Sequence, residues 1–90
     1  VLTSVALINS DKQSVMINRS SVRFMPLNDD EISTYVATKE GLDKAGGYGI
    51  QGFGAGFIKE INGSYHGIMG LPLSDVRLML KSFDVKIWNF

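Results

Sequence analysis

The sequence predicts a small α/β fold in which a ββα segment, a glycine-rich loop and a second ββα segment follow one another. Three observations support this: strand-like apolar segments, helical spacing of apolar residues after Asn28 and Ser74, and six of the ten glycines within residues 46–56. Ninety residues, 44% hydrophobic and 20% charged, fit one small domain or a piece of one. We therefore expect residues 1–90 to form a single partial domain.

The N-terminal third has the composition of a bent antiparallel hairpin. Residues 1–8 are almost entirely apolar or β-branched, which predicts a strand covered on both faces, and polar turn residues follow at 9–11. Within residues 14–24 the apolar positions change parity, so a bulge or break is expected near residues 18–21. The chain opens in mid-strand without an initiator Met, which suggests that sequence upstream is missing.

A helix is predicted to begin after Asn28, because Glu31 lies three residues further on, as in a capping box. It should end near residues 39–41. Three residues with the spacing of one helix face predict a stripe towards a core: Ile32, Tyr35 and Val36.

The segment 46–56 is too rich in glycine for a helix interior, so we expect a shaped loop. After it, residues 56–61 and 64–69 flank Asn62-Gly63, which is typical of a two-residue hairpin turn. Ser74 is then expected to cap a final helix. Its apolar stripe consists of Val76, Met79, Leu80 and Phe83.

Composition excludes several classes of function. Nine basic and nine acidic side chains give no net charge, so nonspecific nucleic-acid binding is not expected. There is no cysteine, and His66 is the one histidine, which excludes thiolate chemistry and Cys- or His-rich metal sites. The apolar runs are far shorter than the ~20 residues of a membrane span, and the first residues of the sequence are not a basic region followed by an apolar run. We expect a cytoplasmic protein that does not bind membranes.

Residues 47–52 match the pattern G-x-G-x-x-G of dinucleotide-binding sites. That fingerprint needs a strand before it and a helix after it, whereas here a helix precedes and a strand follows. A dinucleotide site is therefore rejected.

Other candidate residues have local interpretations beside functional ones. Lys44 can contact a phosphate or form a surface ion pair with Asp43. Gln51 offers an amide donor and acceptor suited to a nucleobase edge, or equally to loop backbone. His66 is expected to be a packed or surface residue rather than a catalyst. The acidic residues 29–31 have roles at the helix start, so a metal site there is not expected.

Four segments together resemble the Maf family. Residues 35–36 read Tyr-Val, residues 43–52 read Asp-Lys-Ala-Gly-Gly-Tyr-Gly-Ile-Gln-Gly, residues 61–65 read Ile-Asn-Gly-Ser-Tyr, and residues 70–73 read Gly-Leu-Pro-Leu. The resemblance runs from about Leu2 to Phe83 and implies the C-terminal half of a Maf-like domain, with half of its mixed sheet.

The resemblance implies a cytoplasmic hydrolase that cleaves nucleoside triphosphates to a monophosphate and pyrophosphate with a divalent cation. The form of residues 43–52 is similar to the branch that prefers dTTP and UTP. It implies that Gln51 selects the substrate and that Lys44, Gly49 and Gly52 belong to the substrate loop.

The family's S-x-S-P-R-R motif is missing from this sequence, and so is the A-D-T-like segment that carries the general-base aspartate. No catalytic residue or metal ligand is therefore expected in this chain, and it should be inactive alone. The alternative is a binding or dimerisation module without enzymatic activity. Residues 86–90 form an apolar tail to which we assign no role.

Overall fold

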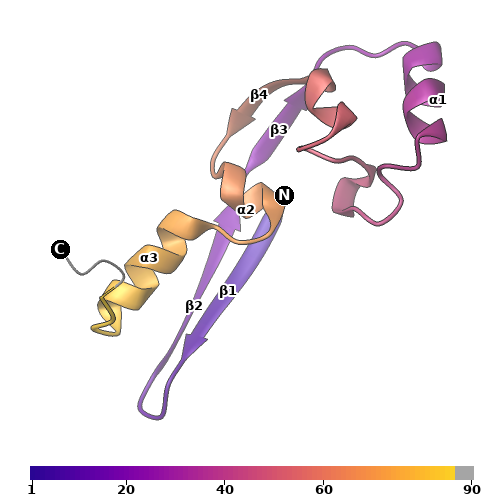
Figure 1. Cartoon of the computed structure of the whole chain (residues 1–90). Helices are drawn as coiled ribbons and strands as arrows, with labels where there is room; N and C mark the ends of the chain where they lie inside the picture. The colour runs from indigo at the N-terminus through magenta and orange to yellow at the C-terminus, as the bar shows by residue number, and fades with distance from the viewer. Residues whose placement is uncertain (87–90) are drawn as a thin grey trace. The chain divides into compact units, whose positions relative to one another are not determined.

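The computed structural model describes residues 1–86, which form two compact units (Figure 1). The first unit comprises residues 1–21 and 62–86, and the second comprises residues 22–61. Most of the predicted tail, residues 87–90, lies outside the described residues. Within residues 1–86 we find no helix with the length and apolar character needed to cross a membrane.

The first unit contains the predicted antiparallel hairpin. Strand β1 (Leu2–Ile8) pairs along its whole length with β2 (Gln13–Arg19). The side chain of Asn9 accepts hydrogen bonds from two backbone N–H groups of the turn, each at 2.8 Å. Exposed and half-buried residues alternate along both strands, so the expectation of two covered faces for the first strand is wrong. Residues 1–8 include the polar residues Thr3 and Ser4. They lie on opposite faces of the strand, so neither face is fully apolar.

The predicted break after the second strand is confirmed at Ser20. This buried residue separates β2 from β3 (Ser21–Phe24), which pairs instead with β4 (Ile58–Asn62). Its hydroxyl donates to Oδ1 of Asn18 and accepts from the N–H of Ser64, both at 2.8 Å. The chain thus passes from one sheet to the other at Ser20, whose hydroxyl is hydrogen-bonded both to β2 and to Ser64.

The predicted hairpin around Asn62-Gly63 is wrong, because the segment after it is helix α2 (Tyr65–Met69). Gly63 has the positive φ of +125° that suits a turn. The hydroxyl of Ser64, however, accepts the N–H of Gly67 at 2.9 Å and caps a helix. A short alternating segment fits either structure, and here the serine cap favours the helix.

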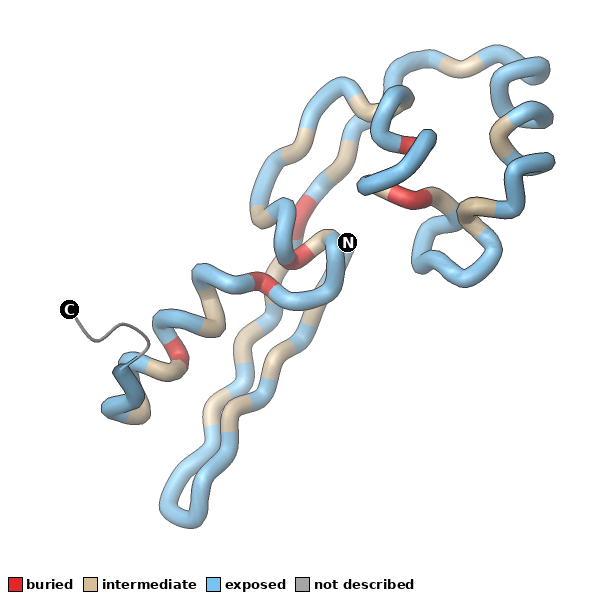
Figure 2. Tube along the Cα trace, in the orientation of Figure 1, coloured by how far each residue is buried: buried red, intermediate tan, exposed pale blue. Residues whose placement is uncertain are grey.

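Helix α3 (Leu73–Ser82) confirms the predicted final helix and its stripe. It begins directly after Pro72 rather than after Ser74, since a proline can precede the first turn without losing a hydrogen bond. Met79 is buried, and the other three residues of the stripe are half-buried. Helix α2 contacts β1, and α3 contacts both β1 and β2. Figure 2 shows how few of the described residues are buried.

In the second unit, the predicted capping box of helix α1 (Asp29–Ala37) is confirmed. The side chain of Asn28 accepts the N–H of Glu31 at 2.8 Å, and Glu31 accepts the N–H of Asn28 at 3.2 Å. The helix ends before the predicted residues 39–41.

The predicted core-facing stripe of α1 is wrong for two of its three residues. Ile32 and Val36 are 46% and 64% exposed, whereas Tyr35 is half-buried and packs edge-on against Phe57 at 5.3 Å between ring centroids.

The predicted order of elements is wrong in its second half, because the glycine loop is followed by β4, α2 and α3. Mixed α and β structure is retained, in two two-stranded sheets.

Candidate functional site

The glycine loop joins α1 to β4 and is shaped, as predicted, rather than helical throughout. It contains two short 3₁₀ turns, η1 (Ala45–Gly47) and η2 (Phe53–Phe57). Between them the N–H of Gly52 donates to the carbonyl of Gly49 at 3.3 Å. This bond closes a four-residue turn in which Gln51 is the third residue. The loop therefore presents Gln51 at a defined bend between two glycines.

The side chain of Glu40 lies inside this loop and accepts three hydrogen bonds. Its Oε1 accepts the backbone N–H of Phe53 at 2.8 Å, and its Oε2 accepts the N–H of Gly54 at 3.0 Å. Oε2 also accepts the hydroxyl of Tyr35 at 2.5 Å. That hydroxyl in turn accepts the N–H of Gly49 at 2.9 Å. One carboxylate and one phenol thus bind both sides of the turn that carries Gln51.

The loop approaches these two side chains so closely that a side chain at Gly52 or Gly54 would have to displace a group that now binds the loop. A Cβ atom at Gly52 would collide with Oε1 of Glu40. At Gly54, a Cβ atom would lie 2.7 Å from the carbonyl oxygen of Gly49 and 2.9 Å from the Tyr35 hydroxyl. The space that a side chain would fill is therefore already taken by the groups that bind the loop.

The same contacts shift two pKa values in opposite directions. The Tyr35 hydroxyl, followed by the N–H groups of Gly54 and Phe53, lowers the pKa of Glu40 below its ordinary value of 4.5. Partial burial, followed by the hydrogen bond to Glu40, raises the pKa of Tyr35 above 10.0. At neutral pH the carboxylate is therefore charged and the phenol neutral, as the hydrogen bonds require.

The predicted substrate residues lie in this loop. Gln51 is exposed, and within residues 1–86 its side chain makes no hydrogen bond, so the alternative of a glutamine that braces loop backbone finds no support. Gly49 is buried against Tyr35, and Gly52 closes the turn. Lys44 pairs with Asp43 at 3.3 Å, as the local interpretation expected, and its side chain stays 48% exposed.

The remaining candidates make local contacts. His66 lies in helix α2 of the first unit, where its ring is 5.8 Å from that of Tyr65. Glu31 is engaged in the capping box of α1. Across residues 1–86, no group of three or more His, Asp or Glu side chains is arranged to hold a metal ion.

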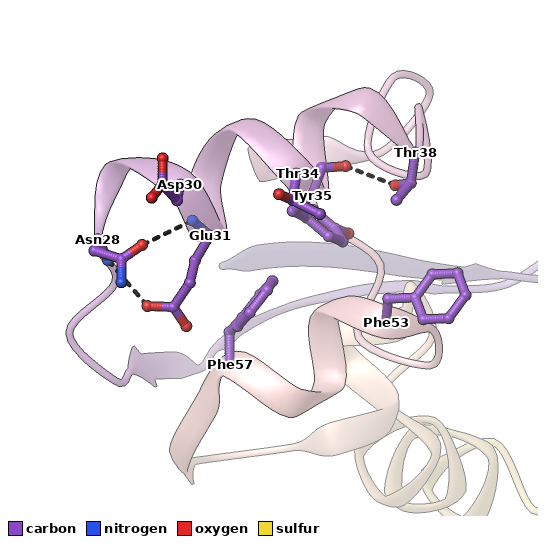
Figure 3. A pocket seen from close by; sticks show the side chains of 8 residues that line it. All are labelled: Asn28, Asp30, Glu31, Thr34, Tyr35, Thr38, Phe53 and Phe57. Atoms are coloured by element: carbon purple, nitrogen blue, oxygen red, sulfur yellow. Dashed lines mark hydrogen bonds between the residues drawn. The ribbon is translucent and has the colours of Figure 1, made fainter.

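A hollow of about 560 Å³ adjoins the loop between α1 and η2 (Figure 3). Phe53, beside this hollow, is 74% exposed. The lining residues are Asn28, Asp30, Glu31, Thr34, Tyr35, Thr38, Phe53 and Phe57.

Sequence reasoning missed the roles of Tyr35 and Glu40. Tyr35 fits a helical stripe, so its hydroxyl was overlooked, and Glu40 belongs to no pattern. A usable signal exists nonetheless. A glycine-rich loop exposes many backbone N–H groups, and these need an acceptor when the loop is compact. Glu40, directly before Gly41, is an acidic residue close to the start of that loop.

Comparison of the sequence with known proteins shows the family to which the chain belongs. The family model described as Maf-like protein matches residues 1–83, and the chain belongs to this family. A dTTP/UTP pyrophosphatase of Aromatoleum aromaticum is 58% identical over 83 residues, covering 92% of this chain and 40% of the relative. The dTTP/UTP pyrophosphatases of Bacillus cereus (strain B4264) and Hahella chejuensis are each 46% identical, over 97% and 99% of this chain.

The chain spans less than half the length of these relatives, 40% of the first and 46% and 44% of the other two. The family resemblance seen in the sequence is thus confirmed, for a part of a Maf domain.

Proposed function

We propose that this chain forms the base-recognition side of a nucleoside triphosphate pyrophosphatase that converts dTTP and UTP to the monophosphate and pyrophosphate. The observation that carries the proposal is Gln51, exposed at a bend between two glycines with its amide unbonded within residues 1–86. Membership of the Maf family and the names of the three relatives support the substrate class.

The chemistry of an amide suits this role. The Gln51 NH2 group can donate to a pyrimidine carbonyl while its carbonyl oxygen accepts from the ring N–H. Gln51 is itself exposed, so a base can reach its amide from the solvent side of the bend. Lys44 is proposed as a contact on the phosphate side, since its side chain is 48% exposed and its ammonium pairs with the solvated carboxylate of Asp43.

The chain supplies only part of such a site. Hydrolysis of a triphosphate needs a base or an oriented water and cationic groups around the phosphates. The family resemblance also implies a divalent cation, but residues 1–86 gather no carboxylate cluster that would hold it, so we assign it no ligand here. We infer that the 90-residue chain alone is inactive.

A chimera tests the proposal. Residues 1–83 replace the matched segment of the Aromatoleum aromaticum relative, and pyrophosphate release is measured with dTTP, UTP, dATP and dGTP. The proposal expects the chimera to prefer dTTP and UTP, and the isolated chain to hydrolyse none of the four. A chimera that folds but releases no pyrophosphate, or turnover by the isolated chain, would contradict it.

A non-enzymatic module is the second candidate, and exposed apolar surface favours it. On the open face of the hairpin, Leu2, Ile8, Val15 and Ile17 are each at least 60% exposed. An uncovered apolar face and free strand edges promote self-association. This candidate expects the isolated chain to dimerise in sedimentation experiments and to melt at a temperature that rises with concentration. A concentration-independent monomer would count against it.

A further inference from the structure

The hydrogen bonds around Glu40 bind the loop on both sides of Gln51. On the N-terminal side, the Tyr35 hydroxyl accepts the N–H of Gly49 at 2.9 Å. On the C-terminal side, Glu40 accepts the N–H groups of Phe53 and Gly54 at 2.8 and 3.0 Å. The hydrogen bond from Tyr35 to Glu40 connects the two sides.

Two other contacts of the described residues adjoin the bend: the N–H of Ala55 donates to the Gly52 carbonyl at 3.1 Å, and the ring of Tyr48 packs edge-on against Phe24 at 4.9 Å. The closing hydrogen bond of the bend, from Gly52 to Gly49, is long at 3.3 Å, and glycine on either side of Ile50 and Gln51 leaves the backbone free to adopt other conformations. Exposed loops of this kind open locally at low cost unless other groups bind their backbone. The bonds to Tyr35 and Glu40 therefore help to distinguish this bend from a flexible one.

We propose that Glu40 and Tyr35 are positioning residues for substrate selection: they fix the bend at Gln51 and thereby orient its amide towards the base. This inference rests on the proposed function. Neither residue needs to touch the substrate, because their effect passes through the backbone of residues 49–54. The close approach of Gly52 to the Glu40 carboxylate supports this, since a Cβ atom at position 52 would displace that carboxylate from the loop.

The first arm of the test measures hydrogen exchange of backbone amides in the 90-residue chain by NMR. Tyr35→Phe keeps the ring that packs against Phe57 and removes the hydroxyl, so exchange at Gly49 should rise about tenfold. Glu40→Gln keeps the size and removes the charge, so exchange at the amides of residues 53 and 54 should rise similarly. Matched controls on exposed residues, Tyr65→Phe and Glu60→Gln, should leave all three amides unchanged.

The second arm measures selectivity in the chimera described above. Both variants should lower the ratio of kcat/KM for dTTP to that for dATP by about tenfold, and the controls should not. If they act through Gln51, the double variant Gln51→Ala with Glu40→Gln should be no less selective than Gln51→Ala alone. A purely structural role would instead lower kcat/KM for both nucleotides equally.

The outcomes separate the two proposals. If the unmodified chimera selects dTTP and the variants keep its selectivity, or if the three amides exchange as in the unmodified chain, the inference is overturned and the function stands. If the unmodified chimera folds and hydrolyses nothing, the function fails and the inference with it. Tyr35→Phe is the milder change, and it decides the matter if Glu40→Gln does not fold.

Discussion

The two units of the chain are stabilised by different kinds of contact. In the first unit, helix α3 contacts both strands of the hairpin and buries Met79, with 3% of its surface exposed. In the second unit, the glycine loop is bound by hydrogen bonds to Glu40 and Tyr35. Apolar packing depends on volume and tolerates small shifts, whereas hydrogen bonds depend on individual atoms. The first kind suits a scaffold, and the second suits a loop that must orient one side chain.

The largest expected effect is on the apolar packing of the first unit. Met79→Ala removes a buried side chain and should lower the free energy of unfolding by about 2–5 kcal/mol. Leu78→Ala on the same helix is the matched control, because Leu78 is 59% exposed, and it should cost no more than about 0.5 kcal/mol. Urea unfolding followed by circular dichroism measures both. Equal losses would show that α3 does not depend on its buried stripe.

The next effect concerns the loop. In the chimera, Gln51→Ala should cost about 1–3 kcal/mol, or roughly ten- to hundredfold in kcat/KM, for dTTP and UTP. Purine triphosphates should lose less, because the amide is matched to pyrimidine groups. His66→Ala, in the other unit, should change little. Equal losses for all nucleotides would mean that Gln51 only shapes the loop, and no loss would remove it from the site.

A smaller effect is expected from pH. The folded pKa of Glu40 lies below 4.5, so its contribution to stability is present above pH 4.5 and is lost as the pH falls through the folded value. The folded pKa of Tyr35 lies above 10.0, so its contribution is present below pH 10.0 and is lost as the pH rises through the folded value. Urea unfolding from neutral to acidic pH should show a shallower acid limb for Glu40→Gln than for Glu60→Gln. Parallel acid limbs would contradict this.

The smallest effect is expected at the exposed ion pair. Asp43→Asn should change the free energy of unfolding by only ~0–1 kcal/mol, because both partners are solvated. In the chimera it should leave Lys44 free to contact phosphate, so the KM for dTTP should not rise. A rise in KM of tenfold or more would show that the pair positions Lys44.

In both units, the features that depend on residues close together in the sequence were predictable. The stripe of α3 and the capping box of α1 depend on residues three or four apart, so local spacing was sufficient. The break at Ser20 was visible as a change of parity. The hairpin at Asn62-Gly63 failed because two local signals compete there, and in the folded chain the Ser64 hydroxyl caps a helix by accepting the N–H of Gly67.

The site was predictable in part. The glycine content marked the loop, and the resemblance marked Gln51, whose role stays a prediction. The role of Glu40 was not predictable from spacing. Its partners at 53 and 54 lie 13 and 14 residues away in sequence, and they are backbone groups that every residue except proline has.

The absence of a side chain at position 52 has a consequence for anyone redesigning this protein. The volume that residue 52 would occupy belongs to the Glu40 carboxylate, so the two positions share one space. Gly52→Ala should be poorly tolerated beside glutamate and better tolerated beside a shorter residue at 40, which makes their effects non-additive. Libraries that vary the loop to alter nucleotide preference should therefore randomise positions 40 and 52 together, because a side chain introduced at 52 alone meets the Glu40 carboxylate.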